Sequence, residues 1–163
     1  MEIRELGTGD KHGLSELILG LYDTDRKALW FSGKPSRAEL GALFDAKMHM
    51  VKALSAIDIV AMDGERLVGE CEIVKMRDAQ AKIGILVGAQ WQDQGIGGTL
   101  LRHSLEKARE LGINEVLAEV EIGNFKATNF FSKHGFALDA KKARRALVDN
   151  VFRNIVTFII KLD

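Results

Sequence analysis

The stretch that most constrains this chain is "QDQGIGGTLL", from Gln92 to Leu101, where three glycines fall within four residues. Glycine costs about 1 kcal/mol in a helix relative to alanine, yet an amphipathic helical pattern follows at once. The stretch also follows "AKIGILV", a short apolar run that predicts a strand buried on both faces. A helix N-terminus exposes unpaired N–H groups with partial positive charge, and glycines let the backbone approach an anion. The order of strand, glycines and helix therefore indicates a phosphate site, against the alternative of a purely structural turn.

Composition excludes several other classes of protein. The 163 residues carry 23 basic and 23 acidic side chains, and such a balance argues against a nucleic-acid partner. The single cysteine, Cys71, excludes a disulfide framework and a Cys-rich zinc site, and His12 and His49 have no second ligand at metal spacing. We therefore expect no metal. With no apolar run typical of a signal peptide or membrane span, we expect a cytoplasmic protein with no membrane partner. Without repeats or linkers, residues 1–163 are expected to form a single domain.

Periodicity predicts a fold of alternating strands and helices. Expected strands are "MEIREL", "AIDIVAM", "RLVGECEIVKM", "AKIGILV", "EVLAEVEI", "FALDA" and "VFRNIVTFIIKL", with "DGE" as a hairpin turn. Expected helices run from Asp10 to Tyr22, from the N-cap Ser36 to about Leu54, from Thr99 to Leu111, and over "FKATNFFSKH". The segment "KKARR" is interpreted as a solvated loop. This order predicts an α/β (mixed α+β) fold with a mixed sheet of about six to seven strands and helices on both faces.

Two common phosphate motifs do not fit the glycine stretch. A P-loop needs Gly-x-x-x-x-Gly-Lys-Ser/Thr, which is absent. A dinucleotide fold needs Gly-x-Gly-x-x-Gly after its first strand, but position 100 is a leucine. The acid that such a fold expects about twenty residues further on would be Glu115, which opens the next strand rather than closing it.

The remaining pattern resembles the GCN5-related N-acetyltransferase (GNAT) family. The family's pyrophosphate loop, Gln/Arg-x-x-Gly-x-Gly/Ala, stands here as Gln92-Asp93-Gln94-Gly95-Ile96-Gly97. Its next signature appears at the usual separation as "NFKATNFFSKHGF", from Asn124 to Phe136. "DRKALWFSGKPSRAEL" and "QWQDQGIG" also resemble, more weakly, the bacterial protein-lysine acetyltransferase branch.

The resemblance implies the GNAT fold, in which a twisted sheet splits between its fourth and fifth strands, here "KIGILV" and "EVLAEVEI". It implies acetyl-CoA as acyl donor in that gap. The expected cofactor contacts are the main chain of Leu86 and Val87 and the amide of Asn124 for pantetheine, Phe131 near the thioester arm, and a pyrophosphate loop of Gln92, Asp93, Gln94, Gly95, Ile96, Gly97, Gly98 and Thr99.

The implied chemistry is direct transfer of an acetyl group to a primary amine, on a small molecule or on a protein lysine or N-terminus. A base must deprotonate the acceptor ammonium, whose pKa is near 10.4 for lysine. Two positions depart from the family pattern: Phe131 stands where a tyrosine is usual, and Lys82 where the protein-acetyltransferase branch has a glutamate. An acyl-CoA-binding sensor with little or no turnover is therefore the alternative, and a homodimer is one expected assembly.

The carboxylates of two strands are the candidates for the base. Glu119, in the middle of the apolar strand "VLAEVEI", is the first choice, because interior strands seldom hold a charge without a partner or a task. The structural alternative is that Glu119 pairs with a nearby lysine or arginine. In that case the prediction passes to Glu72, which shares a face of the third strand with Glu70.

Overall fold

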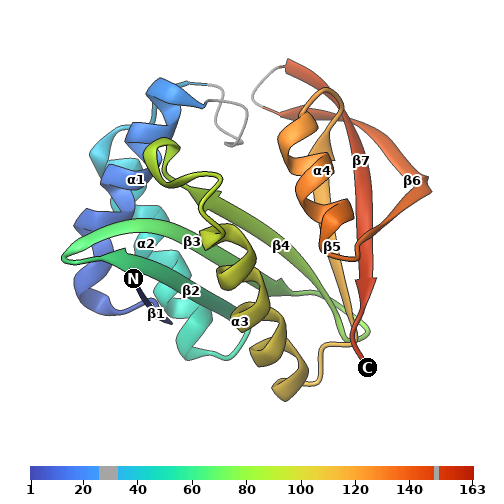
Figure 1. Ribbon diagram of the computed structural model, residues 1–163, viewed down its shortest axis with the longest axis horizontal. Coiled ribbons are helices and arrows are strands. Elements are labelled where there is room, and N and C mark those ends of the chain that lie inside the picture. The colour runs from blue at the N-terminus through green and yellow to red at the C-terminus, as the bar shows by residue number, and fades with distance from the viewer. Residues whose placement is uncertain (26–32, 149–150) are drawn as a thin grey trace.

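Seven strands form one mixed sheet in the computed structural model, which describes residues 1–25, 33–148 and 151–163. The strands lie in the order β1-β2-β3-β4-β5-β7-β6, and every neighbouring pair is antiparallel except β4 and β5 (Figure 1). The elements are β1 (Glu2–Glu5), η1 (Thr8–Asp10), α1 (Lys11–Thr24), α2 (Arg37–Lys52), β2 (Ala56–Asp63), β3 (Arg66–Lys75), β4 (Gln80–Val87), η3 (Ala89–Trp91), α3 (Ile96–Glu110), β5 (Glu115–Glu121), α4 (Phe125–Lys133), β6 (Ala137–Val148) and β7 (Val151–Lys161). The predicted mixed sheet is confirmed.

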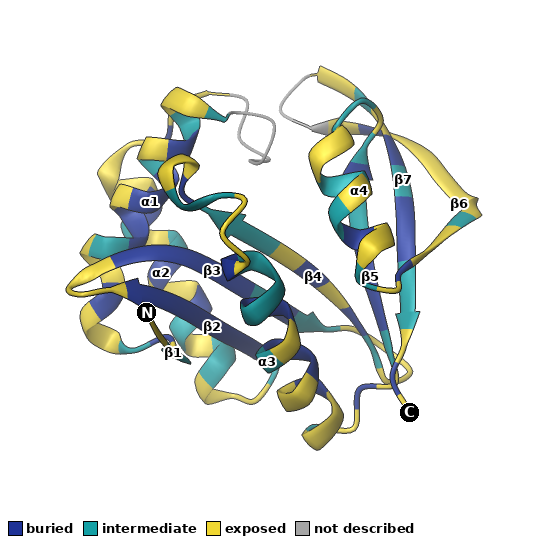
Figure 2. Ribbon diagram, in the orientation of Figure 1, coloured by how far each residue is buried: buried dark blue, intermediate teal, exposed yellow. Residues whose placement is uncertain are grey.

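Helices cover both faces of the sheet, as predicted. On one face, α1 and α2 pack Leu14, Leu21 and Phe44 against Val60 of β2. On the other face, the apolar side chains of α3 and α4 pack on the strands in a second core, which includes Leu100. Figure 2 shows β2 and β3 buried between these layers and β6 largely exposed at the edge of the sheet. Burial on both faces therefore fixes the central strands, and the sheet positions the loops at its ends.

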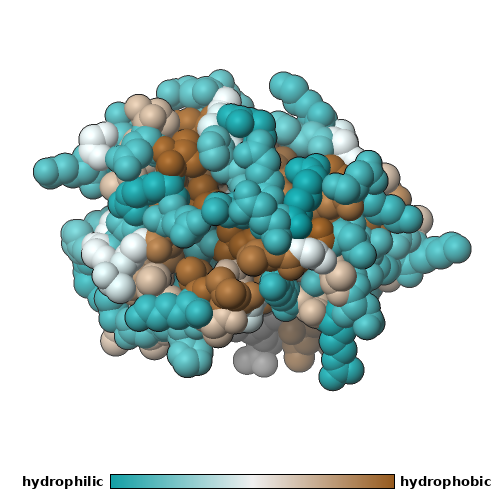
Figure 3. Space-filling model, turned by 90° about the horizontal axis from the view of Figure 1, so that it is seen from below, coloured by the Kyte–Doolittle hydropathy of each residue, from teal (hydrophilic) through white to brown (hydrophobic). Residues whose placement is uncertain are grey.

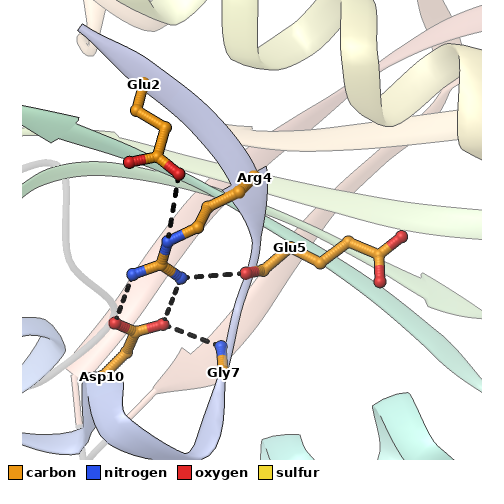
Figure 4. A network of polar contacts seen from close by, with 5 residues as sticks. All are labelled: Glu2, Arg4, Glu5, Gly7 and Asp10. Atoms are coloured by element: carbon orange, nitrogen blue, oxygen red, sulfur yellow. Dashed lines mark hydrogen bonds and ion pairs between the residues drawn. The ribbon is translucent and has the colours of Figure 1, made fainter.

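Local hydrogen bonds cap the start of α2 and hold the turn ahead of α1. Ser36 Oγ accepts a hydrogen bond from the Glu39 backbone N–H, and Glu39 Oε2 accepts one from the Ser36 N–H, which is a capping box. Ahead of α1, the Asp10 carboxylate accepts two hydrogen bonds from the Arg4 guanidinium, at 2.6 and 2.7 Å, and one from the Gly7 N–H (Figure 4). This network joins β1 to the start of α1.

Three predictions of local structure are wrong, for identifiable reasons. β4 is not buried on both faces: Ala81 and Ile83 are buried on the α3 side, but Lys82 and Gly84 are exposed, because a cavity opens over that part of the other face. α3 begins at Ile96 rather than at Thr99, so two of its glycines lie in the first helical turn. "KKARR" is not a loop, because it belongs to β6, whose pairing with β7 is irregular between Asp139 and Arg144.

The surface is mixed in character. Seen from below, the molecule shows hydrophobic side chains gathered in the middle of an otherwise hydrophilic face (Figure 3).

None of the helices described here has both the length and the apolar character needed to cross a membrane. In the described residues, no group of three or more His, Cys, Asp or Glu side chains is arranged to hold a metal ion. Cys71 is fully buried, and burial raises the pKa of its thiol to about 12, so it packs as a small apolar residue.

Candidate active site

The parallel strands β4 and β5 separate part-way along their length. Their pairing runs from Gln80–Glu115 to Ile83–Ala118 and ends there, so the edge of β4 that faces β5 is unpaired from Gly84 to Val87. Figure 1 shows the two strands close together at one end and apart at the other. A cavity of about 1010 Å³ opens at this separation and is lined by β4, β5, α3, α4 and the loop before α3. The predicted split between the fourth and fifth strands is confirmed.

The loop before α3 offers the cavity a helix N-terminus. Gly95 is the N-cap residue and adopts a left-handed conformation with φ of +82°, which glycine adopts at little cost. The first hydrogen bond of the helix runs from the Thr99 N–H to the Gly95 carbonyl, so the N–H groups of Ile96, Gly97 and Gly98 have no partner within the helix. Unpaired N–H groups at a helix start favour an anion.

Three cations reinforce this end of the cavity. Arg102 on α3 and Lys126 and Lys133 on α4 all line it. Lys126 Nζ donates to Gln92 Oε1 at 2.9 Å, and Gln92 Nε2 donates to the Val87 carbonyl at 3.0 Å. The loop is thereby tied both to β4 and to the first turn of α4. Positive charge next to free N–H groups suits a polyphosphate.

The glycines of α3 also serve packing. A Cβ at Gly97 would lie 3.2 Å from Phe130 Cε2, and one at Gly98 would lie 2.9 Å from His134 Nε2. Larger residues at either position would push α4 away from α3. These glycines can therefore serve both roles: they leave the backbone open to a phosphate, and they allow α3 and α4 to pack closely.

Most of the sequence-predicted cofactor residues line the same cavity. They are Leu86, Val87, Gln92, Asp93, Gly95, Gly97, Gly98, Thr99, Asn124 and Phe131. Two others do not: Ile96 is buried in the core, and the exposed Gln94 side chain donates to the Gln90 carbonyl. Gln94 lies in the loop before α3 and Ile96 is the first residue of α3, so only their backbone groups fit the predicted role.

α4 contributes a polar residue at its N-cap and two aromatic residues in its second half. Asn124 is its N-cap and accepts a hydrogen bond from the Ala127 N–H at 3.1 Å. Phe131 is buried and packs edge-on against Phe130 and Phe136, with ring centroids 5.3 and 5.0 Å away. The rings of Phe130 and Phe131 thus form an apolar part of the cavity wall.

Glu119 on β5 lies between two cations. Its Oε1 is 3.0 Å from Lys82 Nζ, and both of its carboxylate oxygens accept from Arg144 Nη2 at 3.1 Å. Burial by itself raises the pKa of Glu119, but the hydrogen bonds and charges of Lys82 and Arg144 bring it below the ordinary value. This arrangement is the ion pairing that the sequence analysis named as the alternative to a catalytic role.

Glu72 on β3 belongs to a different cluster. One ammonium, Lys47 Nζ of α2, lies 2.9 Å from Glu72 Oε1, 3.0 Å from Glu70 Oε1 and 3.4 Å from Asp58 Oδ2. Burial alone lowers the pKa of Lys47, but the three carboxylates raise it above its usual range. Lys47, Glu70 and Glu72 line the cavity, and Asp58 lies behind them on β2.

Sequence reasoning missed Lys47 and Asp58, although each leaves a signal. Lys47 falls at helical spacing from Leu40 and Phe44, on the face of α2 that is buried. Asp58 interrupts the apolar strand "AIDIVAM" in the same way that Glu119 interrupts its own strand. A charge in an otherwise buried pattern indicates a partner, but the partners come from other elements of the chain.

A strand edge without a partner, a helix N-terminus and neighbouring cations in one cavity suit an extended ligand with a phosphate end. This makes acyl-CoA-dependent transfer the class of chemistry that the fold and the site define.

Comparison with known proteins identifies the family. A model of the acetyltransferase (GNAT) family matches residues 25–136, which is more than half of the chain, so the protein belongs to this family. It is an N-acetyltransferase that uses acetyl-CoA as its acyl donor. A search among curated protein sequences gave no match.

Solved structures with low sequence identity share the fold. A ribosomal-protein-alanine N-acetyltransferase from Brucella melitensis has a TM-score of 0.84 at 18% identity, covering 99% of this chain and 100% of that one. YncA, a putative acetyltransferase from Salmonella typhimurium solved with acetyl-CoA, has a TM-score of 0.79 at 18% identity, covering 99% and 94%. Spermidine N-acetyltransferase from Vibrio cholerae, solved with CoA and spermine, has a TM-score of 0.77 at 19% identity, covering 98% and 94%.

Proposed function

We propose that the protein acetylates a primary amine that reaches the thioester from the α1 and α2 side of the sheet, with Glu72 as the proton acceptor. The observation that carries this proposal is the register at the strand separation. Glu72 pairs directly with Gly84, the first residue of β4 that has no β5 partner. A thioester held along this free edge would lie next to the Glu72 side chain, on a wall of the same cavity.

Charge favours Glu72 over Glu119 as the base. Both carboxylates flank the point of separation, and both side chains are about one-quarter exposed, at 25% and 22%. Glu119 is held by two cations of its own, which stabilise its ionised form and make it a weak proton acceptor. Glu72 shares one ammonium with two other carboxylates, so its negative charge is less completely neutralised.

In the proposed reaction, Glu72 takes a proton from the acceptor ammonium, and the amine lone pair attacks the thioester carbonyl carbon. The C–S bond of the resulting adduct then breaks, and the nitrogen passes its remaining extra proton to the departing thiolate, which leaves as the CoA thiol. A thiol pKa near 8.5 makes CoA a fair leaving group without an acid, which suits the phenylalanine at position 131. An unpaired backbone N–H on β4 beyond Ile83 would steady the oxyanion.

The proposal assigns the donor's contacts to the two halves of the cavity. The pyrophosphate lies on the N–H groups at the start of α3, near Arg102, Lys126 and Lys133. Pantetheine runs along the free edge of β4 at Leu86 and Val87, with Asn124 across from it. We further propose that residues 1–163 act as one acetyltransferase domain in the cytoplasm, on a small amine or a protein amine. We also propose that two copies of the chain form a homodimer, and sedimentation velocity would measure that mass in solution.

Release of free thiol tests the proposed function. The protein is incubated with acetyl-CoA and, in turn, spermidine, an aminoglycoside, free amino acids and peptides that carry lysine or a free N-terminus. We expect thiol release that depends on at least one of these amines, with the acetylated product seen by mass spectrometry. Tight acetyl-CoA binding without thiol release on any acceptor would overturn the proposal in favour of a binding module.

A further inference from the structure

A buried group of four charged side chains lies beneath the acceptor half of the cavity and is called here the Lys47 cluster: Lys47, Asp58, Glu70 and Glu72. Three elements build it, because Lys47 comes from α2, Asp58 from β2, and Glu70 and Glu72 from β3. The side chains of Lys47, Asp58 and Glu70 are at least nine-tenths buried, whereas Glu72 is 25% exposed. The cluster therefore meets the cavity mainly through Glu72, with Glu70 behind it.

Two oxygens in this cluster have no donor. Asp58 Oδ1 and Glu70 Oε1 are both buried, and neither accepts a hydrogen bond from any group in the described part of the chain. Glu70 Oε1 lies 3.0 Å from Lys47 Nζ but outside the geometry of a hydrogen bond. A buried acceptor without a donor is costly, at about 1–3 kcal/mol.

One proton held between the two carboxyl groups supplies a donor inside the cluster. The carboxyl groups of Asp58 and Glu70 are close enough to hydrogen-bond to each other when Asp58 is protonated. Burial, and then the charge of Glu70, raise the pKa of Asp58 to about 9, although Lys47 opposes the shift. Two carboxylates that share a site keep a proton in this way because both cannot ionise at low cost.

With that proton in place, the charges of the cluster do not balance. Two negative charges, on Glu70 and Glu72, face the single positive charge of Lys47. Two further pairs of opposite charge lie along the strands beyond the cluster: Lys82 on β4 with Glu119 on β5, and Glu121 on β5 with Arg153 on β7. The side chains that α1 and the rest of α2 place on the cavity, Ile18 and Leu43, are apolar.

We propose that the Lys47 cluster holds one proton between Asp58 and Glu70 and uses its remaining negative charge, at Glu72, to bind the acceptor as an alkylammonium ion. An alkylammonium next to Glu72 brings the cluster to neutrality without any rearrangement of the buried groups. Lys47, Asp58 and Glu70 act as positioning residues, since they set the charge and the place of Glu72 without touching the acceptor. This inference rests on the proposed acceptor side of the reaction and adds the ionic form in which the acceptor binds.

The shared proton can be observed without any ligand. Carbon-13 NMR of protein labelled in the side-chain carboxyls of aspartate reports which carboxyl groups are protonated. At pH 7 we expect one aspartate carbon at the protonated position, and we expect this signal to disappear in Asp58→Asn and to titrate at a lower pH in Glu70→Gln. If every aspartate of the folded wild-type protein is ionised at pH 7, the proposal is overturned.

The unneutralised charge is tested by binding alone. Calorimetry compares n-butylammonium with 1-butanol on protein saturated with CoA. We expect n-butylammonium to bind at least about tenfold more tightly than the alcohol, and Glu72→Gln to remove that preference. Glu121→Gln is the matched control, because Glu121 lines the same cavity but is paired one-to-one with Arg153 at 2.8 Å, so the preference should persist.

The possible outcomes separate this inference from the proposed function. Equal binding of the cation and the alcohol, or an equal loss in Glu72→Gln and Glu121→Gln, would contradict the ammonium site even if acetyl transfer occurs. Retention of the ammonium preference and of the NMR signal in a protein that releases no thiol would support the site and contradict the proposed function.

Discussion

Gly97 on α3 and Phe130 on α4 lie so close that a Cβ at position 97 would be 3.2 Å from Phe130 Cε2 and 3.7 Å from Val87 Cγ2. The same glycine belongs to the first helical turn, where backbone N–H groups are free to meet a phosphate. The position thus couples the packing of two helices to the proposed cofactor loop.

Gly97→Val should weaken acetyl-CoA binding by about tenfold or more while the fold survives. The added side chain would block the backbone and displace Phe130. Calorimetry on a variant with unchanged circular dichroism measures the effect. Gly20→Val in α1 is the control, because a Cβ there meets nothing within 4 Å.

A second variant separates the two reasons for this glycine. If the loss in Gly97→Val comes from the clash with Phe130, adding Phe130→Leu should restore part of the affinity. If the loss comes from the blocked phosphate approach, the double variant should bind as weakly as the single one. Unaltered affinity in Gly97→Val itself would remove the loop from the site.

Phe131→Tyr should raise turnover if departure of the thiolate limits the reaction, because position 131 lines the cavity and a hydroxyl there could donate a proton to the sulfur. Position 131 is also buried among aromatic rings. The free energy of unfolding should therefore fall by about 1–3 kcal/mol unless the new hydroxyl finds a hydrogen-bond partner. Thiol release per folded molecule on one acceptor provides the measurement. Phe136→Tyr is the control, since Phe136 is equally buried but does not line the cavity. An equal or lower rate in Phe131→Tyr would mean that thiolate departure is not limiting or that another donor already serves.

Glu72→Gln and Glu119→Gln should behave oppositely. Removal of the proton acceptor at Glu72 should cut turnover by about 10²-fold or more, with a smaller loss at high pH, where more of the amine is already neutral. Glu119→Gln should keep its rate per folded molecule but melt earlier, since it removes the partner of Lys82 and Arg144. Steady-state rates and melting curves on both variants decide between them. A 10²-fold loss confined to Glu119→Gln would restore Glu119 as the base.

The pH dependence of stability gives Glu119 a further signature. Because folding lowers the pKa of Glu119, its ionised form stabilises the folded state above the ordinary glutamate pKa of 4.5. That contribution is lost as the pH falls through the lowered value. The difference in melting temperature between wild type and Glu119→Gln should therefore be largest at neutral pH and should shrink toward zero in acid.

Asp10→Asn should destabilise the fold at neutral pH by about 1–3 kcal/mol, because it leaves the Arg4 guanidinium without its carboxylate. The hydrogen bond from Arg4 is the main cause that lowers the pKa of Asp10, with help from the Gly7 N–H and against burial. Its stabilisation is present above the ordinary aspartate pKa and disappears as the pH falls through the lowered value. Urea unfolding at pH 7 and in acid measures it. Asp45→Asn is the control: its ion pair with Lys11 is exposed and should contribute only about 0–1 kcal/mol. An equal loss in both variants would contradict the importance of the partly buried network in Figure 4.

Local patterns predicted most of the elements and the loop at the proposed cofactor end of the site. Ser36 and Glu39 stand at the spacing of a capping box, and α2 begins there. The glycine stretch after an apolar strand indicated a helix start that suits a phosphate, and the structure places the start of α3 on the wall of a cavity. Such signals depend on neighbours within a few residues, so the sequence contains all of their information.

The charges at the acceptor end depended on tertiary structure. From the sequence, Glu119 and Glu72 were two similar carboxylates in two apolar strands. Folding brings Lys82 and Arg144 to Glu119 but only a shared Lys47 to Glu72, and these partners lie 25 to 37 positions apart along the chain. The proton affinity of a buried carboxylate follows from the charges around it and from its burial.

What the sequence by itself determined is therefore the order of strands and helices, the family to which the chain belongs and the loop that suits a phosphate. Only the tertiary structure decided which carboxylate is neutralised, which keeps an excess of negative charge and why β4 is open on one face. The physical reason is range: caps, turns and hydrophobic periodicity act over a few residues, whereas the electrostatic free energy of a buried group depends on every charge that folding places within a few ångströms of it.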